Sequence, residues 1–295
     1  MKHSSKVTFI LLGFFLVAQF IGLGIVYNYI DVTQESGFKD LPIGERPDVS
    51  EETSYIPIIL AILIGTVIML FLLKRKLTWI WKAWFFLAIF LSLIVAFFAF
   101  VPAYVALVLA LLFAIWKIFK PNFWVQNLTE LFIYGGLAAI FVPILNLVSV
   151  SVLMVLIAIY DAYAVWKSKH MITLAKAQTD AKVFAGLMIP YATGKKGKIV
   201  KSVKKSAAKV STKMTKVKVR TAVLGGGDIG FPLIFAGVVM TKMGLWQSLI
   251  IPFFAAIGLT WLLFHGKKDQ FYPAMPFIGV GCFVGLGVVW LIGLI

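Results

Sequence analysis

The segment "GGGDIGFP", residues 225–232, opens an apolar run that is long enough to cross a membrane. It places Asp228 directly after three consecutive glycines. An ionisable side chain inside a bilayer is costly and by default marks a functional site, and glycines weaken a helix. Their combination at the start of a membrane span indicates a chemical role for Asp228.

The composition of the whole chain is typical of a polytopic membrane protein. Of its 295 residues, 61% are hydrophobic and only 14% are charged, whereas soluble domains average roughly 45–50% and about 25%. The basic excess is concentrated in residues 195–220, which hold eleven Lys or Arg and no acid. No nucleic-acid-binding motif accompanies them, so we expect no nucleic-acid partner. The single cysteine, Cys282, excludes an intrachain disulfide, and we expect neither a metal nor another cofactor.

Nine apolar runs approach the length of about 20 residues that a spanning helix needs. The first run lacks a clear cleavage site, so we expect a retained helix and not a signal peptide. Pro102 separates the third and fourth runs, and the fifth and sixth divide near residues 146–149. The sequence thus predicts an all-α membrane protein with nine transmembrane helices. The runs cover residues 7–27, 55–73, 84–101, 102–119, 131–148, 149–166, 222–241, 245–264 and 273–295.

The charge distribution predicts how these helices are oriented. With a cytoplasmic N-terminus, the inner segments hold 25 of the 28 Lys and Arg, and the outer segments hold 3. Cytoplasmic loops are enriched in these residues, so we expect a multi-pass protein of the cell membrane with an extracytoplasmic C-terminus. Seven of the twelve acids fall in the first outer loop. We place Glu130, Asp180 and Asp269 at or beyond helix ends, which leaves Asp161 and Asp228 within the spans.

The chain divides into an N-terminal six-helix part (1–166), a basic cytoplasmic linker (167–220) and a C-terminal three-helix part (221–295). The basic part of the linker has apolar residues at spacings of three and four, which fits an amphipathic helix on the inner leaflet; a disordered tether fits equally well. Its end, "KVKVRTAV" (216–223), alternates with period two, which predicts a strand.

The two intramembrane acids lie at similar depth. Asp161 comes six residues before Lys167, and Asp228 comes eight residues after Arg220. At a helical rise of 1.5 Å per residue these spacings give depths of roughly 9 and 12 Å from the inner boundary. The two helices run antiparallel, so the carboxyl groups can meet at one level.

Two adjacent carboxyl groups share one proton and so supply a base and an acid. The base can activate water while the acid donates to a carbonyl oxygen, which is sufficient to hydrolyse an amide without a metal. A cation site or a proton-coupled transporter would use the same pair, so these remain alternatives.

Two neighbouring segments favour a peptide substrate. The three glycines remove every Cβ beside Asp228, so that a second backbone can approach. At the start of the last run, "YPAMP" (272–276) contains two prolines, which withhold amide donors and favour an irregular backbone. We expect this segment to present an exposed backbone edge to an extended substrate.

At these residues the chain resembles the GxGD intramembrane aspartyl proteases, the presenilin and signal peptide peptidase family. Tyr160-Asp161 matches the YD motif of the family, and the glycines with Asp228 match its GxGD motif. Pro273-Ala274-Met275 matches its PAL motif with Met in place of Leu. The order of the motifs and the nine-span plan agree over nearly the whole chain, and the long outer loop is similar to that of prokaryotic, archaeal-type members. Other intramembrane proteases fit less well, because the chain has no HExxH motif and no serine–histidine pairing within its spans.

The resemblance implies an aspartic endopeptidase that cleaves transmembrane protein substrates within the lipid bilayer, without obligatory partner subunits. Its catalytic pair would be Asp161 and Asp228. The strand before the seventh span would pair with an extended substrate. The residues implied to contact the substrate are Tyr160, Gly225, Gly226, Gly227, Pro273, Ala274 and Met275.

Overall fold

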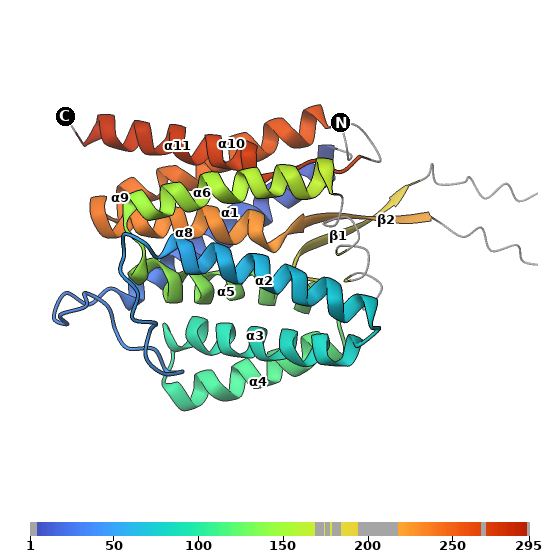
Figure 1. Cartoon of the computed structure of the whole chain (residues 1–295), viewed down its shortest axis with the longest axis horizontal. Helices are drawn as coiled ribbons and strands as arrows, with labels where there is room; N and C mark the ends of the chain where they lie inside the picture. Colours follow the sequence, from blue (N-terminus) through green and yellow to red (C-terminus); the bar gives the residue numbers. More distant parts are fainter. Residues whose placement is uncertain are drawn as a thin grey trace, which may run out of the picture.

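The computed structural model describes residues 5–168, 174, 178, 184–193, 218–266 and 270–293. Most of these residues are helical, and one two-stranded sheet joins the helices at one end (Figure 1). The elements are α1 (Ser5–Tyr29), α2 (Tyr55–Lys74), α3 (Thr78–Phe98), α4 (Ala103–Phe119), α5 (Phe123–Phe141), the 3-10 helix η1 (Val142–Ile144), α6 (Leu147–Ala162), the π-helix η2 (Tyr163–Lys167), β1 (Gly186–Thr193), β2 (Lys218–Gly225), α8 (Gly226–Met243), α9 (Leu245–Ser248), α10 (Ile250–His265) and α11 (Met275–Ile292).

Seven helical segments are long and apolar enough to cross a membrane. Each of the nine apolar runs contains a helix, but α4 has only 17 residues and α8 is not among the seven. Helix α8 carries Asp228, Lys242 and four glycines, which lower its apolar character. A membrane protein built mainly of helices is therefore confirmed, whereas nine spans remains a prediction. The fold is mostly helical, as expected, and the described residues add one two-stranded sheet, β1–β2.

Helix α8 occupies the centre of the bundle. It packs against α1, α5, α6, α10 and α11, and most of its side chains from Ile229 to Met240 are buried. A helix enclosed by protein in this way does not need a lipid-compatible surface all round, which is why it tolerates an acid in its first turn.

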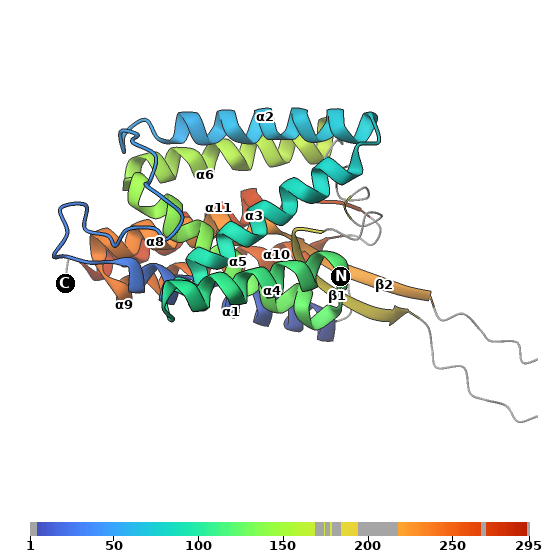
Figure 2. The same cartoon turned by 90° about the horizontal axis from the view of Figure 1, so that it is seen from below.

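Helix α2 lies at the edge of the bundle beside α6, apart from the layer that holds α1, α5, α8 and α10 (Figure 2). It packs against α3 and α6, and none of its side chains is buried. This helix therefore depends on few contacts for its position.

Both joints expected between closely spaced helices are present. Pro102 precedes α4 as its N-cap. Asn146 caps α6: its side chain accepts from the Ser149 amide at 2.8 Å, and the Ser149 hydroxyl accepts from the Asn146 amide at 3.0 Å. This reciprocal capping box is a strong helix start.

The predicted starts of α3 and α5 are wrong by six and eight residues, respectively, because both helices begin in more polar sequence at Thr78 and Phe123.

The strand predicted at 216–223 is present as β2. It pairs antiparallel with β1, from Gly186 opposite Gly225 to Thr193 opposite Lys218. The prediction missed β1, which lies in the semi-apolar part of the linker. The amphipathic-helix or tether alternatives fall on residues 194–217, which lie outside the described residues.

The start of α1 lies at the sheet end of the bundle, and the end of α11 lies at the opposite end (Figure 1). This arrangement fits an odd number of passes through a membrane.

Candidate active site

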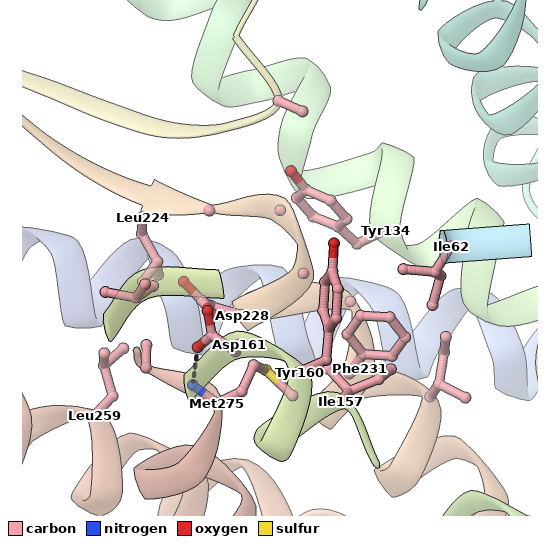
Figure 3. Close-up of a pocket in the computed structure, with 18 of the residues that line it drawn as sticks. Ile62, Tyr134, Ile157, Tyr160, Asp161, Leu224, Asp228, Phe231, Leu259 and Met275 are labelled. Carbon is pink, nitrogen blue, oxygen red and sulfur yellow. Dashed lines mark hydrogen bonds between the residues drawn. The ribbon is translucent and has the colours of Figure 1, made fainter. Parts of the chain in front are cut away.

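Asp161 and Asp228 line the same pocket, a cavity of about 580 Å³ between α2, α5, α6, α8 and the chain before α11. Their carboxyl groups lie next to each other in Figure 3. The predicted meeting of the two acids is therefore present. Eight of the nine predicted site residues line this cavity; Pro273 does not line it, although it is buried directly before Ala274.

Asp161 is held by the segment that contains the PAL-like motif. It lies near the end of α6 with 8% of its surface exposed, and its Oδ2 accepts a hydrogen bond from the Met275 amide at 3.1 Å (Figure 3). Ala274 and Met275 are buried as well. The expected exposed edge is therefore wrong at Met275, since this amide orients the carboxyl group of Asp161. Residues 270–274 are irregular, as the two prolines predict.

Asp228 lies in the first turn of α8, directly after β2. An acid in a first helical turn faces the positive end of the helix dipole, which favours a carboxylate there. The depth calculated from the sequence rests on a wrong assumption, because residues up to Gly225 are a strand, which rises about 3.3 Å per residue. The two acids nevertheless meet, although part of the chain between Arg220 and Asp228 is extended and not helical.

The three glycines before Asp228 serve different contacts. A Cβ on Gly226 would lie 2.5 Å from the Tyr134 hydroxyl oxygen and 2.9 Å from its ring. A Cβ on Gly225 would lie 3.3 Å from Oδ2 of Asp228, whereas one on Gly227 would meet only the Phe231 ring at 3.4 Å. The close neighbour expected beside the glycines is therefore a tyrosine ring. A backbone also approaches Gly226, since its amide donates to the Ala185 carbonyl at 3.2 Å.

The profile of the family "Signal-peptide peptidase, presenilin aspartyl protease" matches residues 13–295, nearly the whole chain. The chain belongs to this family. It is thus an aspartic endopeptidase that acts within membranes, and the transporter alternative loses its support.

Two solved structures resemble the protease in fold. A presenilin family intramembrane aspartate protease in a C222 crystal has a TM-score of 0.63 and 21% identity, covering 97% of this chain and 99% of the other. A structure titled in the same words but in a P2 crystal has a TM-score of 0.62 and 20% identity, covering 96% of each chain. A comparison with curated proteins gives no significant match.

The sheet beside the protease's pocket has one closed and one open edge. The Asn127 side chain accepts from the Met188 amide at 2.9 Å and donates to the Met188 carbonyl at 2.9 Å. Gln126 donates to the carbonyl of Gly186 at 3.0 Å. Both side chains come from α5, so α5 closes the outer edge of β1 at these residues.

The closed edge identifies the backbone groups of β2 that face outward. Bonding direction alternates along an antiparallel pair, so Met188 and its partner Val223 both point away from the ladder. Thr221 points outward by the same alternation, and no hydrogen bond to its amide or to that of Val223 occurs among the described residues. Pro190 pairs with Thr221, so its missing N–H costs no ladder bond.

Tyr160 connects the protease's site to α2. Its hydroxyl lies 2.9 Å from Oγ1 of Thr66, and Thr66 in turn donates to the Ile62 carbonyl at 2.8 Å. Thr66 and Ile62 also line the cavity, so α2 forms one of its walls.

The sequence prediction missed the contribution of α5 to this site. Glu130, which we placed at or beyond a helix end, lies inside α5 with 1% of its surface exposed. It is therefore a third acid within a candidate span. The available signal was the spacing of Gln126, Glu130 and Tyr134, which puts three polar side chains on one face of an otherwise apolar helix.

Proposed function

We propose that Asp161 and Asp228 are the catalytic pair with which this protease hydrolyses peptide bonds in transmembrane helices of other proteins. The observation that carries the proposal is the convergence of two acids, from helices on either side of the linker, on one cavity that also receives the PAL-like segment. Family membership supplies the aspartic chemistry.

In the proposed reaction, one carboxylate removes a proton from a water molecule, and the resulting oxygen nucleophile attacks the scissile carbonyl carbon. The second, protonated carboxyl group donates its proton to the carbonyl oxygen, which gives a neutral gem-diol. Proton transfer to the amide nitrogen then breaks the C–N bond and releases an acid and an amine. The Met275 amide fixes the carboxyl group of Asp161 during these transfers.

A substrate would bind as an additional strand on the open edge of β2. The outward amides of Thr221 and Val223 offer main-chain bonds to an extended peptide, and this edge leads to Asp228 through Gly225. Backbone groups inside a membrane must be satisfied, so a helix unwound for cleavage needs such partners. In this proposal Tyr160, the three glycines and Pro273-Ala274-Met275 shape the cavity around the peptide.

The same proposal includes nine membrane passes with a cytoplasmic N-terminus, in the cell membrane. It keeps the division into residues 1–166, 167–220 and 221–295, with the strand β2 spanning the second boundary. Two observations support it: the start of α1 and the end of α11 lie at opposite ends of the bundle, and positive charge is split 25 to 3 between inner and outer segments. We further propose activity without a metal, a cofactor or partner subunits.

The test is cleavage of a membrane-spanning reporter by purified enzyme in lipid vesicles. Asp161→Asn and Asp228→Asn should each lower the rate by about 10²–10⁴-fold, the contribution typical of a general acid or base. Cleavage at the normal rate by either variant would refute its assignment to the catalytic pair.

A further inference from the structure

Helix α5 contains a buried polar network that contacts both the β1 strand and the turn that carries Asp228. Lys117 of α4 and Glu130 of α5 form an ion pair at 2.6 Å, with 1% and 2% of their side-chain surface exposed. Lys117 also donates to Thr129 Oγ1 at 3.0 Å and to the Gln126 carbonyl at 3.5 Å. All three of its donors are therefore used.

Glu130 accepts from three side chains. Oε1 receives Lys117 and, at 3.0 Å, Nε2 of Gln126, while Oε2 receives the hydroxyl of Tyr134. The same Nε2 also lies 2.9 and 3.0 Å from the carbonyl oxygens of Phe184 and Gly186, so its two hydrogens are shared among three acceptors. The carboxylate of Glu130 thus orients two groups: the side-chain amide of Gln126, which holds the start of β1, and the ring of Tyr134, which packs on Gly226.

These two contacts converge on the reacting groups. Tyr134 lines the cavity and packs against Gly226, two residues before Asp228. Gln126 fixes the chain at Phe184 and Gly186, and Ala185 between them accepts the bond from the Gly226 amide. The turn that carries Asp228 is therefore held from both sides by groups that Glu130 orients.

A buried ion pair is weak evidence for stability, because desolvation offsets most of the attraction between its charges. Its best-attested use is to fix one arrangement among several. Here the arrangement concerns the β1–β2 sheet and the glycine turn (residues 225–228, which carry Asp228), since those are the segments that the network contacts.

We propose that Glu130 is a positioning residue of the protease, which sets the place of Asp228 and of the sheet through Tyr134 and Gln126. The inference rests on the proposed function of Asp228 and of the β2 edge. Loosening the network should lower kcat and let the peptide bind in more than one register, so that cleavage occurs at additional peptide bonds.

The first test compares two buried tyrosines. Tyr134→Phe removes the hydroxyl bonded to Glu130, whereas Tyr29→Phe removes a buried hydroxyl that donates to the Val95 carbonyl at 2.8 Å, away from the cavity. Tyr134→Phe should lower kcat by about tenfold or more, because a shift of about 1 Å at a reacting group costs up to 10²-fold. Mass spectrometry should show additional cut positions, and Tyr29→Phe should leave both unchanged.

A second pair of variants separates the role of the acceptor oxygen from that of the charge. Lys117→Met with Glu130→Gln keeps a side-chain oxygen that can accept from Tyr134, whereas Lys117→Met with Glu130→Leu keeps none. Both are neutral and similar in size. The glutamine variant should retain the wild-type cut position, and the leucine variant should lose it.

Hydrogen exchange provides a readout that does not depend on cleavage. The amide of Gly226 should exchange faster in Tyr134→Phe than in Tyr29→Phe, and the β1 amides of Leu187 and Ile189 should exchange faster in Gln126→Ala than in wild type. Equal exchange in these comparisons, or wild-type kcat and cut positions in Tyr134→Phe, overturns the inference. A wild-type enzyme that fails to cleave refutes the proposed function instead, and exchange still decides the role of the network.

Discussion

Two groups of ionisable side chains lie inside the described part of this protein, and they differ in whether open space borders them. Lys117 and Glu130 are enclosed by four further donors and acceptors, with almost no exposed surface. Asp161 and Asp228 instead line a cavity with room for another molecule. A charge that protein encloses on all sides holds structure in place, whereas one that borders open space is available for chemistry.

The strongest test of this difference removes the cation of the enclosed group. Lys117→Met leaves Glu130 charged and unpaired, which should cost about 3–5 kcal/mol of unfolding free energy. Asp161→Asn should leave the unfolding temperature near that of wild type while it lowers the cleavage rate by about 10²–10⁴-fold. Thermal unfolding in detergent, measured beside cleavage, checks both. If Lys117→Met were as stable as wild type, the enclosed group would have no structural role.

The glycine turn lies where the two groups meet, so it should respond strongly to added volume at one position. Gly226→Ala forces a methyl group against Tyr134, and such overpacking costs about 1–3 kcal/mol. Gly227→Ala is the matched control, since its methyl group would make only an ordinary contact with Phe231. We expect cleavage to fall much further in the first variant, as measured by initial rates at equal amounts of folded enzyme. Equal rates in the two would argue against tight packing on Tyr134.

The two edges of the sheet repeat the contrast between enclosed and accessible groups. Thr221→Pro removes an outward N–H of β2 without touching the ladder, whereas Thr221→Ala keeps it. Cleavage should fall about tenfold in the proline variant alone, because the substrate carbonyl that would accept from this amide is left without a donor, which costs about 1–3 kcal/mol. The measurement is kcat/KM with the reporter, and similar values for both variants would contradict strand pairing by the substrate.

The smallest effect is expected at α2, the least buried helix. Thr66→Val removes the hydroxyl that bonds to Tyr160 and should cost about 0.5–1.5 kcal/mol. Thr66→Ser keeps that hydroxyl and should behave like wild type. Urea unfolding of the two variants would detect the difference, and a Thr66→Val enzyme as stable as Thr66→Ser would show that the bond contributes nothing to the position of α2.

Much of this arrangement could be predicted because it depends on local sequence. Apolar runs set the approximate places of the helices, and Asn146 and Pro102 marked the joints between them. The meeting of Asp161 and Asp228 was predicted from the similar number of residues that separates each from the inner boundary, although part of the segment before Asp228 is a strand and not a helix. The alternation in 216–223 predicted a strand because period two is visible without knowledge of a partner.

What could not be predicted depends on partners far away in the sequence. The sequence around β1 contains Pro190, which argues against a strand unless its N–H is known to face outward. Glu130 looked like a residue of a helix end because the apolar run begins at residue 131, and its partner Lys117, on another helix, could not be identified from the sequence. The Met275 amide seemed free for substrate because the bond to Asp161 joins residues 114 positions apart.

The closed edge of β1 has a consequence for how the enzyme cleaves a mixture of substrates. Gln126 and Asn127 occupy the bonding positions on that side near the turn that carries Asp228, so the sheet can pair with only one further peptide chain there. Two membrane proteins offered together must then exclude each other. Mixtures of substrates should show simple mutual competition, in which each one's inhibition constant equals its own KM when binding is fast.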